Sequence, residues 1–498
     1  MIQQEESQIS RSTNKDHTLW RLGAVIGIVA VVGGLVLAIG GPIAGIAVII
    51  GMLATGAVLR DIEIGFWGVV IVICLLPFAT FPVDIGLTPT LLDLVLGATV
   101  GIWILRLVTG RRRQLETSVI TVPIVIFLIA TVFAFIFGLA NGPLTSNLLR
   151  HFAELLLSIG FVLVIVDYYV EWRRIERIMK VLLISGALTA AIGIFLWLLP
   201  DLSANTILNS LARIGYPGGF VIRYIEDNPA LAERAISTAV DPNALGGLLL
   251  MVGTVAGAQV VARKPLFRRW LTVVFFGVIF VAIVLTFSRG AMVGFFCGLA
   301  LIAVARYRRL IPIMLFLGLL FLLLPFAQDY IARFVEGIQG QDLATQMRFG
   351  EYRDAISLIT RYPIFGVGFA GSPDIDLYLG VANLYFTIGQ EMGLFGLLAF
   401  FLILVVVFGY AFINRHSFKG NDRTDPIWLG LHAALIGGLA AGVFDHYLFN
   451  IDFHHAVTLF WLYIGLSVAT TRTGKLMEEQ PAANFRNEIA IEIEKQIA

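Results

Sequence analysis

Apolar runs of about 17 to 25 residues recur along this chain, and each is long enough to cross the hydrocarbon core of a bilayer. Lipid offers the backbone no hydrogen-bonding partner, so each run must form a helix. The chain has 498 residues, of which 58% are hydrophobic and 14% are charged. The predicted class is therefore an all-α polytopic membrane protein in a lipid bilayer. A formal net charge of +1 argues against a nucleic-acid partner.

We expect about fourteen membrane helices, with twelve as the alternative. Their predicted ranges are 19–39, 43–59, 64–80, 91–108, 118–138, 152–170, 178–199, 243–262, 270–287, 290–305, 310–326, 384–411, 427–444 and 455–471. They fall in three blocks, 19–199, 243–326 and 384–471. A tail (1–18), an outer loop (200–242), a larger outer loop with short helices (327–383) and a second tail (472–498) complete the chain. The run at 19–39 is too long for a signal-peptide core, and residues 488–495 are predicted to form a short surface helix.

The basic residues of the short loops predict the orientation. They gather in 111–113, 173–177, 263–269, 306–309 and 415–423, whereas the turns at 40–42, 81–90 and 445–454 contain no Lys or Arg. Cytoplasmic loops carry the excess of positive charge. Both tails are therefore predicted to be cytoplasmic and the two long loops external, in a cytoplasmic (inner) membrane. Chemistry on the external side has no nucleotide sugar, so it needs a donor carried by the membrane, such as a polyprenyl-diphosphate-linked glycan.

Three arginines are candidates for binding such a donor, because a guanidinium offers paired donors to diphosphate and stays charged. Arg289 lies in a tight junction between two predicted helices, where a lipid-facing interfacial role is the alternative. Arg348 lies in a predicted amphipathic helix together with Arg353, and local ion pairs are the alternative there. Arg234 precedes Asp241, which is predicted to cap the helix at 243–262.

No metal-ligand spacing and no nucleotide-binding glycine loop occurs in the sequence, so neither a metal nor a cofactor is expected. Cys74 and Cys297 lie in apolar runs and are typical of small hydrophobic core residues. The glycines are scattered through the helices, where small residues allow close packing.

Four motifs follow one another in the second half of the chain: Ser288-Arg289-Gly290, then Tyr362-Pro-Ile-Phe-Gly-Val-Gly, Asn383-Leu-Tyr and Glu391-Met-Gly-Leu-Phe-Gly. Their order and spacing resemble the O-antigen ligase and polysaccharide polymerase superfamily of membrane glycosyltransferases, over about residues 234–470. The resemblance implies that Arg289 and Arg348 hold the diphosphate of an undecaprenyl-linked glycan while an acceptor hydroxyl attacks, with inversion and without metal. We add Arg234, Arg353 and Asn383 to the predicted substrate-binding set.

Ligases of this superfamily place a histidine directly before Asn-Leu-Tyr, and this chain has Ala382 there. Substitute bases on the same side are His446 with Asp445, and Glu391. Histidine has a pKa suited to general-base work near neutrality. The structural alternatives are interfacial hydrogen bonding for His446 and Asp445, and pairing with an arginine for Glu391.

Two other functions remain open. A polymerase differs from a ligase only in its acceptor, a glycan or a lipid-linked glycan. A polysaccharide flippase or transporter would carry ionisable residues deep in several helices and internally repeated halves. Most predicted helix centres are uncharged and no repeat is evident.

The topology can be tested with a cysteine placed at Gly340. Because the basic loops fall on one side, we expect an impermeant reagent to label this cysteine from outside intact cells, and a cysteine at Thr109 only after permeabilisation. The reverse pattern would exclude an external site.

Overall fold

The computed structural model describes residues 51–80, 88–110, 116–323, 343–372 and 380–497, and these are almost wholly helical. The expected helix at 19–39, most of that at 43–59, the tail at 1–18 and residues 327–342 lie outside these ranges. Seven described helices are long and apolar enough to cross a membrane, and four more apolar helices are shorter. The all-α, multi-pass membrane class is thereby confirmed.

The long helices are α2 (Ile62–Leu75), α3 (Leu91–Val108), α4 (Thr121–Gly138), α5 (Ser146–Tyr168), α6 (Trp172–Leu198), α7 (Asp201–Ser210), α8 (Pro242–Val261), α9 (Arg269–Leu285), α10 (Arg289–Ala305), α11 (Leu310–Leu322), α13 (Leu343–Arg361), α14 (Leu384–Ile413), α15 (Asp425–Ala441) and α16 (His454–Ile497). Short 3₁₀ turns are η1 (Leu211–Ile214), η2 (Ile225–Asp227), η3 (Ser237–Ala239), η4 (Arg415–Phe418) and η5 (Ile451–Phe453). Strands β1 (Arg223–Tyr224) and β2 (Glu233–Arg234) pair in antiparallel fashion.

Most expected helices are present, with shifted ends. The helix expected at 152–170 begins at Ser146, because the Thr145 hydroxyl accepts a hydrogen bond from Leu148 N (3.1 Å) and caps it. The helix expected at 178–199 begins at Trp172. The separate surface helix expected at 488–495 is wrong, because α16 runs on to Ile497. The tail is rich in Ala and Glu, which favour helix continuation.

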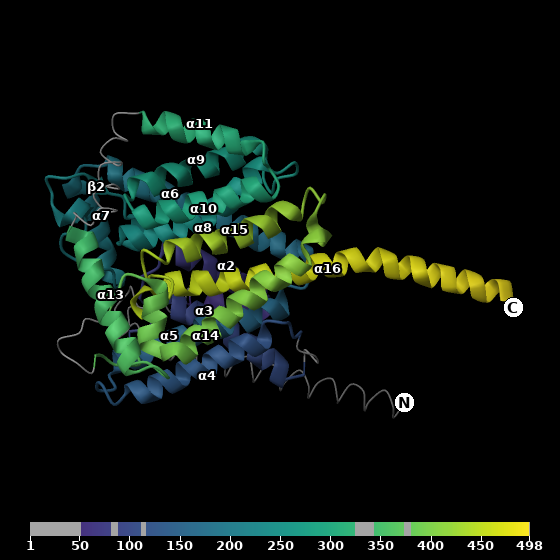
Figure 1. The fold of residues 1–498 in the computed structure, drawn as a ribbon, viewed down its shortest axis with the longest axis horizontal. Coiled ribbons are helices and arrows are strands. Elements are labelled where there is room, and N and C mark those ends of the chain that lie inside the picture. Colours follow the sequence, from purple (N-terminus) through teal and green to yellow (C-terminus); the bar gives the residue numbers. More distant parts are fainter. Residues whose placement is uncertain (1–50, 81–87, 111–115, 324–342, 373–379, 498) are drawn as a thin grey trace, which may run out of the picture.

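The helices form a bundle with two distinct ends (Figure 1). At one end lie α7, β2 and α13, and we call this the α13 end. From the opposite end the C-terminal part of α16 projects away from the bundle. In the middle, α8 packs against α10 and α15, which also pack against each other. A Cβ on Gly294 of α10 would lie 2.4 Å from the carbonyl oxygen of Gly437 of α15, so only glycine permits this approach.

The basic residues of the opposite end are tied to acids on other helices. Arg177 Nε donates to Glu63 Oε1 (2.7 Å), joining α6 to α2. Arg423 Nη2 donates to Glu176 Oε2 (2.6 Å), and Arg306 Nε to Asp425 Oδ1 (3.1 Å). The carboxylates of Glu63 and Glu176 are buried whereas Arg177 and Arg423 are partly exposed, so each arginine compensates a buried charge on a neighbouring helix.

Helix α14 contains a break at Gly393, where φ is 66° and ψ is −169°. The turn at residues 362–368 packs into the break and satisfies the freed backbone groups. Four backbone hydrogen bonds join the two segments: Val367 N to Gln390 O (2.8 Å), Gly368 N to Glu391 O (2.9 Å), Leu394 N to Pro363 O (2.7 Å) and Phe395 N to Ile364 O (3.3 Å). Backbone groups within a membrane must be satisfied by protein. Two of the sequence motifs are therefore one interlocked structural unit.

This unit predicts the effect of Gly366→Ala. Gly366 has a φ of 69°, and an added Cβ would lie 2.5 Å from Gln390 O. We expect a loss of about 1–3 kcal/mol in the free energy of unfolding, from backbone strain and the clash. The control is Gly409→Ala within α14, where a new Cβ meets no atom within 4 Å. Thermal unfolding of the detergent-solubilised variants measures the difference, and equal stabilities would contradict the interlock.

Candidate functional site

Residues 442–450 connect α15 to η5 at the α13 end, and we call them the 442–450 loop. Its backbone carbonyl groups accept hydrogen bonds from the residues at the start of α14. Leu384 N donates to the carbonyl oxygens of Gly442 (2.7 Å) and Asp445 (3.1 Å), and Asn383 Nδ2 donates to that of Val443 (2.9 Å). Asn383 Oδ1 accepts hydrogen bonds from the next turn and caps α14. The Asn383 side chain is thus engaged in positioning the helix.

Helix α13 lies against the same loop. Tyr352 donates its hydroxyl proton to Val443 O (3.3 Å), and Glu351 Oε2 accepts a hydrogen bond from Ala382 N (3.0 Å). One turn earlier, Arg348 is near enough to the loop for its positive charge to oppose the rise in the pKa of Asp445 that burial causes. Arg353 is exposed on the same helix. Of the two predicted arginines on α13, Arg348 is the one that lies near the loop.

Arg289 is the first residue of α10, and Ser288 is its N-cap. The neighbouring Gly290 packs against the loop so closely that a Cβ there would lie 3.0 Å from the Cβ of Phe444. Arg289 therefore lies where α10 meets the 442–450 loop. The N-terminus of a helix carries partial positive charge, which adds to that of the guanidinium.

Arg234 lies on β2 and is held by two hydrogen bonds. Its Nε donates to Thr286 O (2.8 Å) and its Nη2 to Asn243 Oδ1 (2.7 Å). Asp241 caps α8 through Asn243 N and Ala244 N, which confirms the helix-entry prediction. Arg234 thus links β2 to the junction between α9 and α10. The residue that it contacts there, Thr286, lies two positions before Ser288.

Asp445 and His446 face each other within the loop. The His446 Nδ1 lies 3.5 Å from Asp445 Oδ1. Asn450 Oδ1 accepts from Asp452 N (2.9 Å), so the Asn450 amide nitrogen faces His446 Nε2 at 2.8 Å. In the neutral imidazole, Nε2 then accepts and Nδ1 carries the proton. Nδ1 lies on the Asp445 side of the ring, but at 3.5 Å it makes no hydrogen bond to that carboxylate, whose Oδ1 accepts from the backbone His446 N (2.8 Å).

The ionisation of Asp445 is controlled by its surroundings. Burial raises the pKa of this carboxyl above its usual value, and the charge of Asp241 acts in the same direction. His446 and Arg348 act in the opposite direction. The net shift is upward, as expected for a desolvated carboxylate.

Glu391 lies at the break in α14, next to the 362–368 turn. Its Oε2 is buried, and in the described part of the chain it has no hydrogen-bond partner. The same holds for both side-chain polar atoms of the adjacent Gln390. None of the hydrogen bonds recorded for these residues joins Glu391 to the 442–450 loop.

Two features were not predicted from the sequence. Glu351 binds the backbone of Ala382, the position that the superfamily gives to histidine. A second cluster, of Asp93, Glu154 and His454, lies at the starts of α3 and α16 and in α5. The only sequence signal for it is the presence of ionisable residues in otherwise apolar helices.

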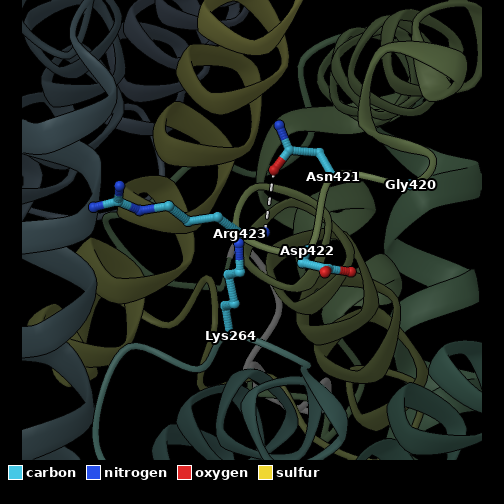
Figure 2. Close-up of a pocket in the computed structure, with 5 residues that line it drawn as sticks. All are labelled: Lys264, Gly420, Asn421, Asp422 and Arg423. Carbon is cyan, nitrogen blue, oxygen red and sulfur yellow. Dashed lines mark hydrogen bonds between the residues drawn. The ribbon is translucent and has the colours of Figure 1, made fainter.

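A pocket of about 640 Å³ lies at the opposite end of the bundle, lined by Lys264, Gly420, Asn421, Asp422 and Arg423 (Figure 2). Within it, Arg423 N donates to Asn421 Oδ1 (3.1 Å), and the guanidinium of Arg423 points away toward α6. None of the predicted site residues lines this pocket, so it is distinct from the candidate site.

Apolar helices long enough to cross a membrane define a multi-pass membrane protein, and the predicted arginines Arg234, Arg289 and Arg348 lie at its α13 end. Residues 271–401 match the family model described as O-antigen ligase. This segment contains Arg289, Arg348, Arg353, Asn383 and Glu391, whereas the 442–450 loop lies beyond it. Over this segment the chain is similar to the O-antigen ligase family, which supports the resemblance found in the sequence motifs. No curated protein matches the chain.

Proposed function

We propose that this protein transfers or polymerises a glycan carried on a polyprenyl diphosphate, at the outer face of the cytoplasmic membrane. The observation that carries the proposal is that Arg289 and Arg348, from two separate helices, both lie beside the 442–450 loop. A diphosphate needs cationic donors from more than one side. The N-terminus of α10 adds a further favourable field for an anion.

The transfer step is a displacement at the anomeric carbon. The acceptor hydroxyl oxygen forms a bond to that carbon while the bond to the diphosphate oxygen breaks, and the polyprenyl diphosphate leaves. Arg289 and Arg348 stabilise the negative charge that develops on the leaving group. No metal is required for this step.

His446 is the proposed base. Its Nε2 is an acceptor that now binds the Asn450 amide, and an acceptor hydroxyl would replace that amide. The hydroxyl proton passes to Nε2, and Asp445 on the Nδ1 side stabilises the imidazolium that forms. Glu391 is the alternative base, because its Oε2 is buried without a hydrogen-bond partner among the described residues.

The proposed orientation places the α13 end outside and both termini in the cytoplasm. The basic residues at 173–177, 306–309 and 415–423 lie at the opposite end, where they pair with Glu63, Glu176 and Asp425. Cytoplasmic loops carry this excess of positive charge.

Alanine at Arg289 or Arg348 is expected to slow transfer by about 10²–10³-fold, because a preorganised donor to the leaving group is lost. Lysine should restore only part of the rate, since a point charge cannot reproduce the paired contact. The assay measures release of polyprenyl diphosphate from a lipid-linked oligosaccharide. Arg223→Ala, at an exposed arginine on β1, is the matched control. Normal transfer by both alanine variants would exclude the diphosphate site.

The pH dependence tests the His446–Asp445 pair. Because burial raises the pKa of Asp445, this carboxylate is protonated at a higher pH than an exposed aspartate. Protonated Asp445 cannot stabilise an imidazolium, so we expect transfer to fall as the pH drops through this raised pKa. Asp445→Asn should be slow and lack that limb, and His446→Ala should lose about 10²–10⁴-fold.

Asp227→Asn, at an exposed acid near β1, should keep the wild-type profile. Unchanged rates in both His446→Ala and Asp445→Asn would transfer the base assignment to Glu391, which Glu391→Gln then tests. A large gain from Ala382→His would indicate that this chain lacks an efficient base.

A further inference from the structure

Three ionisable side chains from distant parts of the chain meet at the α13 end, and their arrangement does not depend on the proposed function. Asp93 is in the first turn of α3, Glu154 is in α5 and His454 begins α16. His454 Nδ1 lies 3.2 Å from Asp93 Oδ1 and 3.7 Å from Glu154 Oε2. One atom of each side chain is thus directed toward a common point.

Each carboxylate has its other oxygen anchored by the protein. Asp93 Oδ2 accepts a hydrogen bond from Thr90 N (2.7 Å) in the capping box of α3. Glu154 Oε1 accepts one from Arg150 Nη1 (2.9 Å). Such supporting contacts orient the ligands of a metal site and fix which oxygen faces the ion. The oxygens that face His454 are therefore held in place.

The His454 side chain supplies an independent observation. It is only 8% exposed, and within the described residues its Nε2 has no hydrogen-bond partner, while its Nδ1 approaches only the carboxylates of Asp93 (3.2 Å) and Glu154 (3.7 Å). Asp93 Oδ1 is buried and faces this same imidazole without a well-aligned hydrogen bond. Buried polar atoms without partners cost free energy, so a bound group that engages them is the simplest explanation.

We propose that Asp93 Oδ1, Glu154 Oε2 and His454 Nδ1 bind a divalent cation of the zinc or manganese class. Ligand atoms bonded at about 2.0–2.2 Å lie about 3 to 3.5 Å from one another around such an ion, close to the observed separations. The donor set of one imidazole and two carboxylates suits these metals more than calcium or magnesium, which prefer oxygen alone. Metal binding displaces any proton held on the ligand carboxyls, and the two resulting carboxylate charges exceed the single positive charge of Arg150.

The ion would act as a clamp between α3, α5 and α16. Asp93 is 14% exposed at its side chain, so water can reach the site and complete the coordination. The alternative is that His454 is an imidazolium bridging Asp93 and Glu154 with no metal. In that arrangement the proton on His454, in place of a metal ion, would balance the charge of the carboxylates. The experiment below distinguishes a bound metal from this protonated imidazole.

The test uses the full chain, purified without chelator and analysed by elemental mass spectrometry after incubation with Zn²⁺ or Mn²⁺. We expect about one ion per chain, and EDTA should lower the unfolding temperature until Zn²⁺ or Mn²⁺ is restored. Asp93→Asn, Glu154→Gln and His454→Gln should each lose the ion. The control Asp227→Asn should retain it.

A spectroscopic measurement on the wild-type protein tests the site without relying on variants, whose loss of the ion could reflect misfolding. In the wild-type protein loaded with Mn²⁺, electron spin-echo spectroscopy should detect one coupled imidazole nitrogen. Wild-type protein that binds neither metal, or binds Mn²⁺ without nitrogen coupling, would overturn the proposal. A folded His454→Gln variant that keeps the ion would overturn it as well.

Discussion

The backbone carbonyl groups of the 442–450 loop organise the α13 end. Gly442 and Asp445 accept hydrogen bonds from the first residue of α14, and Val443 accepts from Asn383 and Tyr352. Irregular backbone near membrane depth persists only where protein groups satisfy it. The loop therefore fixes where α13 and α14 begin to pack. The arginines and the His446–Asp445 pair take their positions from this constraint.

The break in α14 obeys the same rule. A helix interrupted at Gly393 would leave backbone groups unsatisfied, and the 362–368 turn supplies partners for them. This explains why two glycine-containing motifs belong together although more than twenty residues separate them. It also explains why Glu391 lies against a turn and apart from the 442–450 loop. The proposal that Glu391 acts as a base rests on its isolated, buried carboxyl and not on a neighbouring residue that would orient it.

The ends of the helices show how far local sequence decides structure. The predicted capping residue Asp241 marked the start of α8 correctly, whereas Asn383 was predicted to bind substrate and caps α14. Hydrophobicity alone placed the starts of α5 and α6 six residues too late, because their first turns are polar and extend beyond the apolar span. The tail was predicted as a separate short helix, since apolar runs carry no information on how far a polar helix continues.

The sequence by itself determined the membrane class, most spanning helices, the superfamily motifs and Arg289 and Arg348 as candidates. These follow from composition, from caps and from residues close together along the chain. Only the tertiary structure decided that Glu351 binds Ala382 and that the imidazole of His446 faces Asp445. It alone brought Asp93, Glu154 and His454 together. No spacing rule connects positions 93, 154 and 454, because helix packing sets which faces meet.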